Sequence, residues 1–445
     1  MVRNTTVAAA VAAALASSAA MAGQPTPAQA ASPAVGLYIA GSSAAKNAVL
    51  NVLENSSSFC GGSYSLFSST GNTNFYAVSC TPATTTGLPG ATGSAVYTIW
   101  YRDEGGSVVG ALPLVSGSSI NQLSLSGASG SSGSYTVAVG GSSATNGIDD
   151  SFTGGVTPEP VQAGILDVEP GALVGNNYPS AYKPSVYGHA TAAQLAALSP
   201  STIFDQVFGI FVNNKSSPAV LPATVNLTRA EIGAILQGLD TNWSQVSDTT
   251  GAAIASSQAI TIVNREQGSG SRTATDIFFT NDHCVASPAQ TPIKESTGGT
   301  ADYFSTGNVL AAANTIPGSI TYATIDNAGT SYPNLTLVNV DGITPSNLNA
   351  AIGVYGDWYE ATVVTGPNFG SLSADQQGLI NNLISAFQAI GTTASAVDIV
   401  ANPSYNSISF PVSGTGQVPN GGTKTVYVGE YTRNGNSCND PYPAL

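Results

Sequence analysis

The sequence is poor in charged side chains, which make up 8% of its 445 residues, against about 25% in typical soluble domains. Basic residues are scarcest, because 11 Lys and Arg stand against 25 Asp and Glu, giving a net charge of -14 at pH 7. A chain this acidic is repelled by nucleic-acid phosphates and by anionic lipid surfaces. We therefore expect no nucleic-acid binding and no attachment to an anionic membrane surface.

Histidine and cysteine are also rare, with 2 and 4 residues, and no Cys-x-x-Cys pair is present. We therefore expect no metal site and no cofactor. An even number of cysteines in an exported chain predicts two disulfides. Three pairings of the four are open, and we favour Cys60 with Cys80 and Cys284 with Cys438.

The N-terminus has the pattern of an export signal. Arg3 precedes an alanine-rich apolar stretch at 7–20, and small-residue cleavage sites follow at 20–22 and 28–30. Neither site is followed by cysteine, so a lipid anchor is not expected. No later apolar run is long enough to span a bilayer. We expect residues 1–30 to be a cleaved signal peptide and the protein to be periplasmic or secreted.

The most informative stretch is AITIVNREQGSGSRTATDIFF at 259–279. Its β-branched start predicts a buried strand, and Arg265, a Gly/Ser turn at 268–271 and a helical pattern follow in that order. Unpaired N–H groups at a helix start, serine hydroxyls and a forked guanidinium together suit a small tetrahedral oxyanion. The plainer alternative is a surface turn whose arginines pair with carboxylates. The Gly-x-x-x-x-Gly-Lys pattern of a nucleotide-binding loop is absent.

Three further strand ends carry residues of the same kind. The strands expected at 35–40 and 95–101 each lead into a turn of small residues, and the apolar strand within 161–170 ends in an acid. That acid either caps the next helix or accepts a hydrogen bond from a protonated ligand. The candidates at these places are Ser42, Ser43 and Ala44; Ser107, with Arg102 as an extra donor; and Asp167.

Expected strands and helices alternate along the chain, which predicts the α/β class. Ligands of open α/β sheets lie beyond the carboxyl ends of strands, where all four turns fall. Strands expected near 207–212 and 358–364 have the position of crossings between two domains. Two polar segments interrupt the pattern at 55–93 and 116–160. We interpret the first as a disulfide-closed excursion and the second as a β or loop insertion.

Five segments, in order, resemble the periplasmic phosphate-binding proteins of bacterial phosphate ABC transporters, in the type 2 periplasmic binding protein superfamily. They are GSSA at 41–44, LDVEP at 166–170, LTRAEIGAILQGLDTNW at 227–243, REQGSGSRTATDIFF at 265–279 and PGSITYATI at 317–325. The resemblance implies two α/β lobes with a ligand cleft between them. Lobe I would comprise 31–207 plus 358–445, and lobe II 208–357.

The resemblance also implies roles for the candidate residues. Arg265 would pair with phosphate oxygens, with donors from the turn at Ser269, Gly270 and Ser271. Ser43 and Ala44 would donate from the first turn, beside Ser42. Asp167 would accept the proton of a protonated phosphate, and Ser107 matches the family's second turn more loosely. One departure is Ser271, where the family usually has threonine, so the hydroxyl is kept.

The expected function is that of an exported, monomeric binding protein for phosphate or a close oxyanion, without a catalytic role. The expected partner is an ABC transporter permease. The alternatives are a phosphatase-like enzyme that uses the same pocket and a secreted protein of this fold with an adhesion or surface role. The sequence has neither a metal-ligand cluster nor a Ser-His-Asp order for the enzyme. Which oxyanion is preferred stays open.

Overall fold

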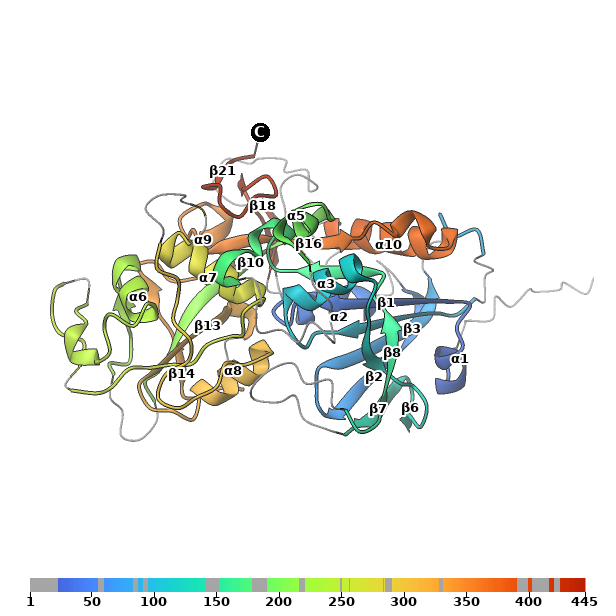
Figure 1. Ribbon diagram of the computed structural model, residues 1–445, viewed down its shortest axis with the longest axis horizontal. Helices are drawn as coiled ribbons and strands as arrows, with labels where there is room; N and C mark the ends of the chain where they lie inside the picture. The colour runs from blue at the N-terminus through green and yellow to red at the C-terminus, as the bar shows by residue number, and fades with distance from the viewer. Residues whose placement is uncertain are drawn as a thin grey trace, which may run out of the picture.

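The computed structural model describes residues 23–54, 60–82, 87–90, 95–140, 152–177, 190–215, 221–248, 250–255, 257–282, 284, 290–327, 331–389, 399–401, 416–419 and 425–444. These residues form two lobes that lie side by side and are joined by long strands (Figure 1). No helix in these ranges is long and apolar enough to cross a membrane.

Lobe I is organised around β1 (Val35–Gly41), the first strand of the chain. β4 (Tyr97–Arg102) and β9 (Ala163–Leu166) pair with β1 in parallel, one on each side. All side chains of β4 and β9 are buried. Parallel strands that are covered on both faces have nearly continuous apolar sequences. The sequences of β4 and β9 have this character.

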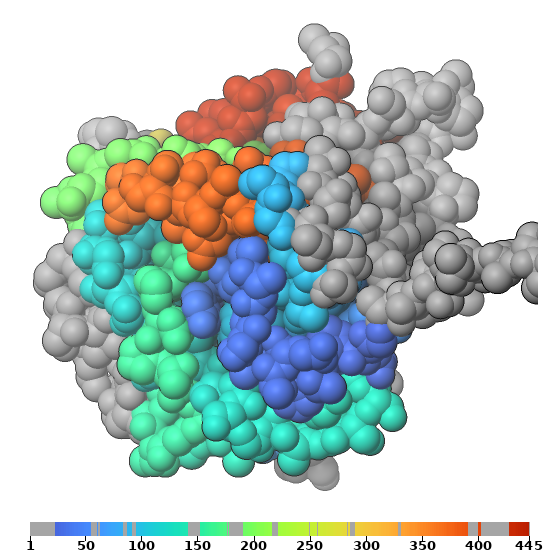
Figure 2. All heavy atoms as spheres, turned by 90° about the vertical axis from the view of Figure 1, so that its right-hand side faces the viewer, coloured from blue at the N-terminus to red at the C-terminus, as the bar shows by residue number. Residues whose placement is uncertain are grey.

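Three helices cover this sheet. α2 (Lys46–Glu54) and α10 (Ala374–Gln388) share one apolar core, and α3 (Ser107–Ser116) packs in another. α10 lies across the outer face of lobe I, and the inserted strands form its lower edge (Figure 2). We did not predict α3 from the sequence. It places the candidate site because its first residue is Ser107.

Lobe II has a smaller sheet around β13 (Ser319–Thr324), with β12 (Thr261–Ile262) parallel to it. Trp243 is fully buried in this lobe and donates from its indole nitrogen to the carbonyl of Gly318 at 2.8 Å. Thr228 and Glu231 form a capping box at the start of the next helix, because each side chain accepts a hydrogen bond from the backbone N–H of the other residue. The helices of lobe II are α6 (Arg229–Leu236), α7 (Gly270–Thr280), α8 (Thr306–Ala313) and α9 (Asn347–Ala351).

Two strands run between the lobes. β10 (Ser199–Asn213) pairs with β16 (Trp358–Thr365) up to Val207 and with β13 from Phe208 onward, antiparallel in both cases. The change of partner on β10 lies between Val207 and Phe208. Motion of the lobes about β10 and β16 would leave each sheet intact.

The two insertions extend the sheet of lobe I. β2 (Cys60–Gly71) and β3 (Phe75–Pro82) form a hairpin that pairs with β4, whereas we expected an excursion. Pairing along a sheet edge is a long-range contact, which the polar composition of this segment does not reveal. In the second insertion, β6 (Ser129–Ser131) and β7 (Ser134–Val139) extend this sheet beyond β2, whereas β5 (Ser119–Leu123) and β8 (Val156–Pro160) pair with each other in a separate two-stranded sheet.

The favoured disulfide pairing is confirmed. Cys60 and Cys80 join the two strands of the hairpin with Cα atoms 5.6 Å apart. Cys284 and Cys438 lie 154 residues apart in the chain and bind the C-terminal region to the end of α7. The remaining elements are α1 (Pro27–Ala31), β11 (Asn226–Leu227), β14 (Leu335–Leu337), β15 (Asn339–Val340), α5 (Ala192–Ala196), β17 (Val400–Ala401), β18 (Gly416–Pro419), β19 (Thr425–Val428), β20 (Tyr431–Thr432) and β21 (Tyr442–Pro443).

Candidate functional site

Four helix N-termini meet where lobe I faces lobe II. α2 and α3 follow strands of lobe I, and α7 and α8 begin in lobe II. Backbone bonds join them across the boundary, since Val108 N–H donates to Gly268 at 3.0 Å and Gly105 N–H donates to Phe304 at 3.3 Å. Helix N-termini carry unpaired N–H groups and partial positive charge, so this meeting point favours an anion.

The close approach of the lobes depends on glycine at Gly106. Its φ of +71° lies in the left-handed region, and a Cβ there would sit 3.0 Å from the Cα of Ser269 in lobe II. A side chain at this position would therefore strain the backbone and hold the two turns apart. Because residue 106 is a glycine, the turn after β4 and the turn after β12 contact each other directly.

Asp167 lies at the centre of the site and is 1% exposed. Its carboxylate accepts from Ser42 in lobe I and, at 2.8 Å, from the amide of Gln206 on β10. Ser107 and Ser271 each donate to its second oxygen at 3.4 Å, the latter from lobe II. Burial raises the pKa of Asp167, while the Ser42 hydroxyl and the charge of Arg265 oppose that shift. Asp167 thus organises hydroxyls from both lobes.

Arg265 is the buried cation of the site, at 1% exposure. Its guanidinium donates to the carbonyls of Tyr303 and Phe304, each at 3.0 Å, and to the hydroxyl of Thr306 at 2.9 Å. These bonds fix the plane of the guanidinium at the start of α8. A planar guanidinium held in this way can bind two oxygens of one anion with little loss of side-chain freedom.

The turn before α7 has the expected form. Ser269 is the N-cap, and its side-chain oxygen accepts from Arg272 N–H at 3.4 Å. Gly270 and Ser271 are the first helical residues, so their N–H groups have no partner within the helix. A Cβ on Gly270 would lie 2.2 Å from the Ser107 hydroxyl. The α7 turn therefore fits against lobe I only with glycine there.

The first turn contributes from the other side of the boundary. Ser42 accepts from Ala45 N–H at 2.9 Å, and Ser43 contacts the Thr306 hydroxyl at 3.1 Å. Ala44, which follows Ser43 in the turn before α2, is buried. The structure therefore brings the turns at 42–44 and 268–271 together with Ser107, Asp167 and Arg265 at the boundary of the lobes.

Arg102 is the candidate that lies elsewhere. It is fully buried, pairs with Glu104 at 3.4 Å and donates to the carbonyl of Asn121 at 3.1 Å. Its guanidinium also lies over the rings of Phe75 and Phe152, with 5.2 and 5.6 Å to the centroids. These contacts direct it into the inserted strands, where it stabilises their packing on β4.

Asp103 is a buried carboxylate that our sequence reasoning passed over. It is 1% exposed, and both carboxylate oxygens have no hydrogen-bond partner among the described residues. Burial raises its pKa to about 7, although the charges of Lys46 and Arg265 pull it down. A buried carboxyl with no donor is costly unless a ligand supplies one. Its position two residues after the strand expected at 95–101 was the available signal.

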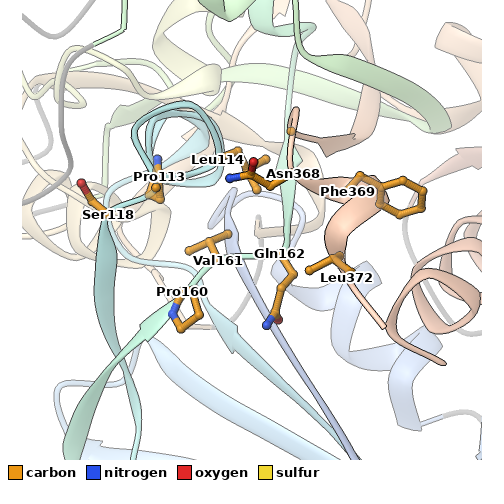
Figure 3. Close-up of a pocket in the computed structure, with 11 residues that line it drawn as sticks. Pro113, Leu114, Ser118, Pro160, Val161, Gln162, Asn368, Phe369 and Leu372 are labelled. Carbon is orange, nitrogen blue, oxygen red and sulfur yellow. The ribbon is translucent and has the colours of Figure 1, made fainter. Parts of the chain in front are cut away.

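A pocket of about 170 Å³ lies elsewhere in lobe I, between the C-terminal end of α3, the start of β9 and the segment before α10 (Figure 3). Its lining includes Leu114, Val161 and Phe369 and is mainly apolar. None of the candidate residues lines it. The candidate site for an anion is therefore at the boundary of the lobes and is separate from this pocket.

Comparison with known proteins supports the fold. Residues 207–372 match the family model of the PBP superfamily domain. The two-lobed α/β architecture is that of the type 2 periplasmic binding proteins, as predicted. The resemblance inferred from the motifs is thereby confirmed at the level of the superfamily. No curated protein matched the chain.

Similar solved structures include three bacterial proteins. A Clostridium perfringens protein, described as a candidate phosphate ABC transporter substrate-binding protein with bound phosphate, is 14% identical with a TM-score of 0.44, covering 78% of this chain and 92% of its own. An ABC-type phosphate transport receptor from Vibrio cholerae is 14% identical with a TM-score of 0.41, covering 80% and 96%. A phosphate-binding protein from Stenotrophomonas maltophilia is 15% identical with a TM-score of 0.34, covering 61% and 81%.

Proposed function

We propose that this chain binds inorganic phosphate, or a close tetrahedral oxyanion that carries a proton, between lobe I and lobe II. The supporting observation is that the fixed guanidinium of Arg265, the N-terminus of α7 and the buried carboxyl of Asp103 belong to one meeting point of the lobes. Cationic and N–H donors suit the ionised oxygens of phosphate. A carboxylate suits its protonated oxygen.

The two buried carboxylates have different roles in this proposal. Asp167, to which we first gave the proton-acceptor role, already accepts from Ser42, Ser107, Ser271 and Gln206. Asp103 has no such donors among the described residues. We therefore assign acceptance of the phosphate proton to Asp103 and the positioning of the hydroxyls to Asp167. Sulfate has no proton at neutral pH, so an ionised Asp103 would repel it.

The wider role that we propose is delivery of the anion to an ABC transporter permease by an exported, monomeric binding protein. Support comes from the superfamily match, from the disulfides, which suit an oxidising compartment, and from the resemblance of the site motifs. We assign no catalytic step to the chain. Capture and release would follow from motion of the lobes about β10 and β16.

Calorimetric titration of phosphate-free protein with phosphate and then with sulfate at pH 8 tests the proposal. We expect one phosphate to bind per chain and sulfate to bind at least about a hundredfold more weakly, because a like charge at the acceptor costs several kcal/mol. Equal affinity for the two anions would contradict the role of Asp103. Binding of neither anion to folded protein would overturn the proposed function.

A further inference from the structure

The C-terminal strap, which we define as residues 431–439, lies on β16, one of the two strands that join the lobes. Glu360 on β16 is 5% exposed and accepts from the Thr432 hydroxyl, from Arg433 N–H at 3.1 Å and from Gly435 N–H at 2.6 Å. Figure 1 shows the C-terminal elements above β16, at the junction of the two lobes. The strap is therefore part of the hinge region.

Arg433 anchors the strap. Its side chain is 5% exposed and donates to the carbonyls of Trp358 at 2.9 Å and Gly356 at 2.8 Å. Its guanidinium also lies 4.4 Å from the centroid of the Tyr359 ring. Removing the strap from β16 would take the Arg433 donors from these two carbonyls and the three strap donors from the buried carboxylate of Glu360, which is strongly unfavourable.

The far end of the strap contacts both lobes. Ser437 donates through its N–H, at 2.9 Å, and through its hydroxyl to Glu169, which follows β9 in lobe I. The next residue, Cys438, is bonded to Cys284, which lies just after α7 in lobe II. The N-terminus of the same α7 carries Ser269 to Ser271 of the candidate site. The disulfide therefore joins the hinge region to the helix that would hold the anion.

The two disulfides differ in their access to solvent. Cys60 and Cys80 are 0% and 1% exposed, whereas Cys438 is exposed and Cys284 is partly exposed. Reduction of a disulfide requires a thiolate to reach one of its sulfur atoms in line. A dissolved thiol can therefore reduce the bond between Cys284 and Cys438 while the bond between Cys60 and Cys80 is protected by the fold.

We propose that the Cys284–Cys438 disulfide and the C-terminal strap form a redox-sensitive tether that limits separation of the lobes and slows release of the bound anion. The reductant is a small dithiol. One of its thiolates attacks a sulfur of the pair, forms a mixed disulfide and releases the other cysteine as a thiolate. Its second thiolate then attacks the dithiol sulfur of the mixed disulfide and releases the second cysteine thiolate. Two cysteine thiols and the cyclic oxidised dithiol result, so two electrons and two protons pass to the protein. The link to anion release rests on the proposed function.

Brief treatment of the folded protein with dithiothreitol, followed by thiol counting by mass spectrometry, tests selective reduction. We expect modification at Cys284 and Cys438 before Cys60 and Cys80. Small-angle scattering of the anion-free protein should then show a larger radius of gyration after reduction. Reduction of Cys60 and Cys80 at the same rate, or an unchanged radius, would overturn the proposal.

Release of labelled phosphate into excess unlabelled phosphate measures the functional effect. We expect the double variant Cys284→Ser with Cys438→Ser to release phosphate about tenfold faster, as is typical of coupling between separate sites. Its control is Cys60→Ser with Cys80→Ser, which loses a disulfide away from the hinge and should release at the wild-type rate. Equal rates in the two variants would contradict the tether.

The scattering measurement separates this proposal from the proposed function, because it needs no ligand. If wild-type protein binds no phosphate but expands on reduction, the function fails and the tether stands. If phosphate binds but the radius and release rate do not change on reduction, the tether fails and the function stands. If the double serine variant does not fold, selective reduction of the folded wild-type protein provides the same comparison.

Discussion

The hydroxyl of Ser43, in lobe I, lies 3.1 Å from the hydroxyl of Thr306, the first residue of α8 in lobe II. Thr306 N–H also donates to the Ser43 oxygen at 3.0 Å, and Arg265 donates to the Thr306 hydroxyl at 2.9 Å. The contact between Ser43 and Thr306 therefore joins the two lobes and also fixes the guanidinium of Arg265. Lobe closure and the orientation of Arg265 depend on the same hydroxyl group.

The first prediction concerns this hydroxyl. Thr306→Val keeps the shape of the side chain but leaves the guanidinium of Arg265 and the hydroxyl of Ser43 without a shared partner. We expect phosphate to bind about tenfold more weakly, since hydrogen bonds to charged groups contribute about 1.5–3 kcal/mol. Calorimetry would measure this. Thr315→Val is the control, because Thr315 lies after the end of α8 and its exposed hydroxyl donates to the carbonyl of Ala312; equal losses in both variants would contradict the role of Thr306.

The second prediction concerns the charge and shape of Arg265. Arg265→Ala should weaken phosphate binding by about 2–5 kcal/mol, because a buried anion loses its charged partner. Arg265→Lys keeps the charge but loses the planar fork, so we expect it to recover only part of the affinity. Arg229→Ala is the matched control, because Arg229 stacks on Phe278 away from the site, 4.3 Å from the ring centroid. Wild-type affinity in Arg265→Ala would remove the site assignment.

The third prediction concerns the fit of the α7 turn. A Cβ at Gly270 would lie 2.2 Å from the Ser107 hydroxyl and 2.6 Å from the Cβ of Asp167. Gly270→Ala should thus hinder closure and raise the dissociation constant by about tenfold or more, because fewer molecules reach the binding-competent state. Folding should be retained, since alanine favours helix over glycine. Gly307→Ala, also near a helix start, has its nearest neighbour at 3.6 Å and should bind normally.

The sequence predicted the parts of the site that follow a local order. The strand, arginine, Gly/Ser turn and helix around Arg265 all form as expected, because each step depends on neighbouring residues. α3 was missed because the side chains from Ser107 to Leu114 are all buried, which removes the amphipathic pattern, and because Pro113 lies inside the helix. Thr306 was missed because no strand or arginine precedes it to distinguish it from other Ser/Thr segments.

The sequence also could not show which of the neighbouring residues Arg102 and Asp103 faces the site. Successive side chains of a strand point to opposite faces, so only one of two adjacent residues at the end of β4 can face the site. We named Arg102 because it stands between a strand and a Gly/Ser turn, whereas the structure directs Arg102 toward Phe75 and the inserted hairpin. Which of the two side chains faces the site depends on the pairing of β4 with β3. This pairing is a long-range contact, so it could not be predicted from the residues around Arg102.

The fourth prediction concerns processing at the N-terminus, where the sequence offers cleavage after residue 22 or after residue 30. Ser65 donates to the carbonyl of Pro25 at 2.6 Å, Thr98 donates to the carbonyl of Ala30 at 2.9 Å, and Ala30 is fully buried. Cleavage after residue 30 would remove these contacts. We therefore revise the signal peptide expected at 1–30 and propose that the exported protein begins at Gly23, as measured by intact mass and N-terminal sequencing. A start at Ala31 would contradict this.

The fifth prediction concerns pH and the carboxyl of Asp103. Its pKa rises from the ordinary 3.8 to about 7 in the folded protein, chiefly because of burial. The folded state then binds more protons than the unfolded state between these two values, so this group lowers stability as pH rises through that window. Asp103→Asn should remove this loss and raise the unfolding free energy at pH 8, relative to wild type, by about 2–4 kcal/mol. Urea unfolding at pH 5 and pH 8 measures it, with a smaller difference expected at pH 5.

Asp357 provides the comparison that separates stability from binding. Burial also raises its pKa to about 7, and its two oxygens have no hydrogen-bond partner among the described residues. Its charged neighbours are Arg433 and Arg229, not Arg265, so it lies outside the proposed site. Asp357→Asn should therefore show the same stabilisation at pH 8 and keep phosphate affinity, whereas Asp103→Asn should lose discrimination against sulfate. Retention of that discrimination by Asp103→Asn would return the proton-acceptor role to Asp167.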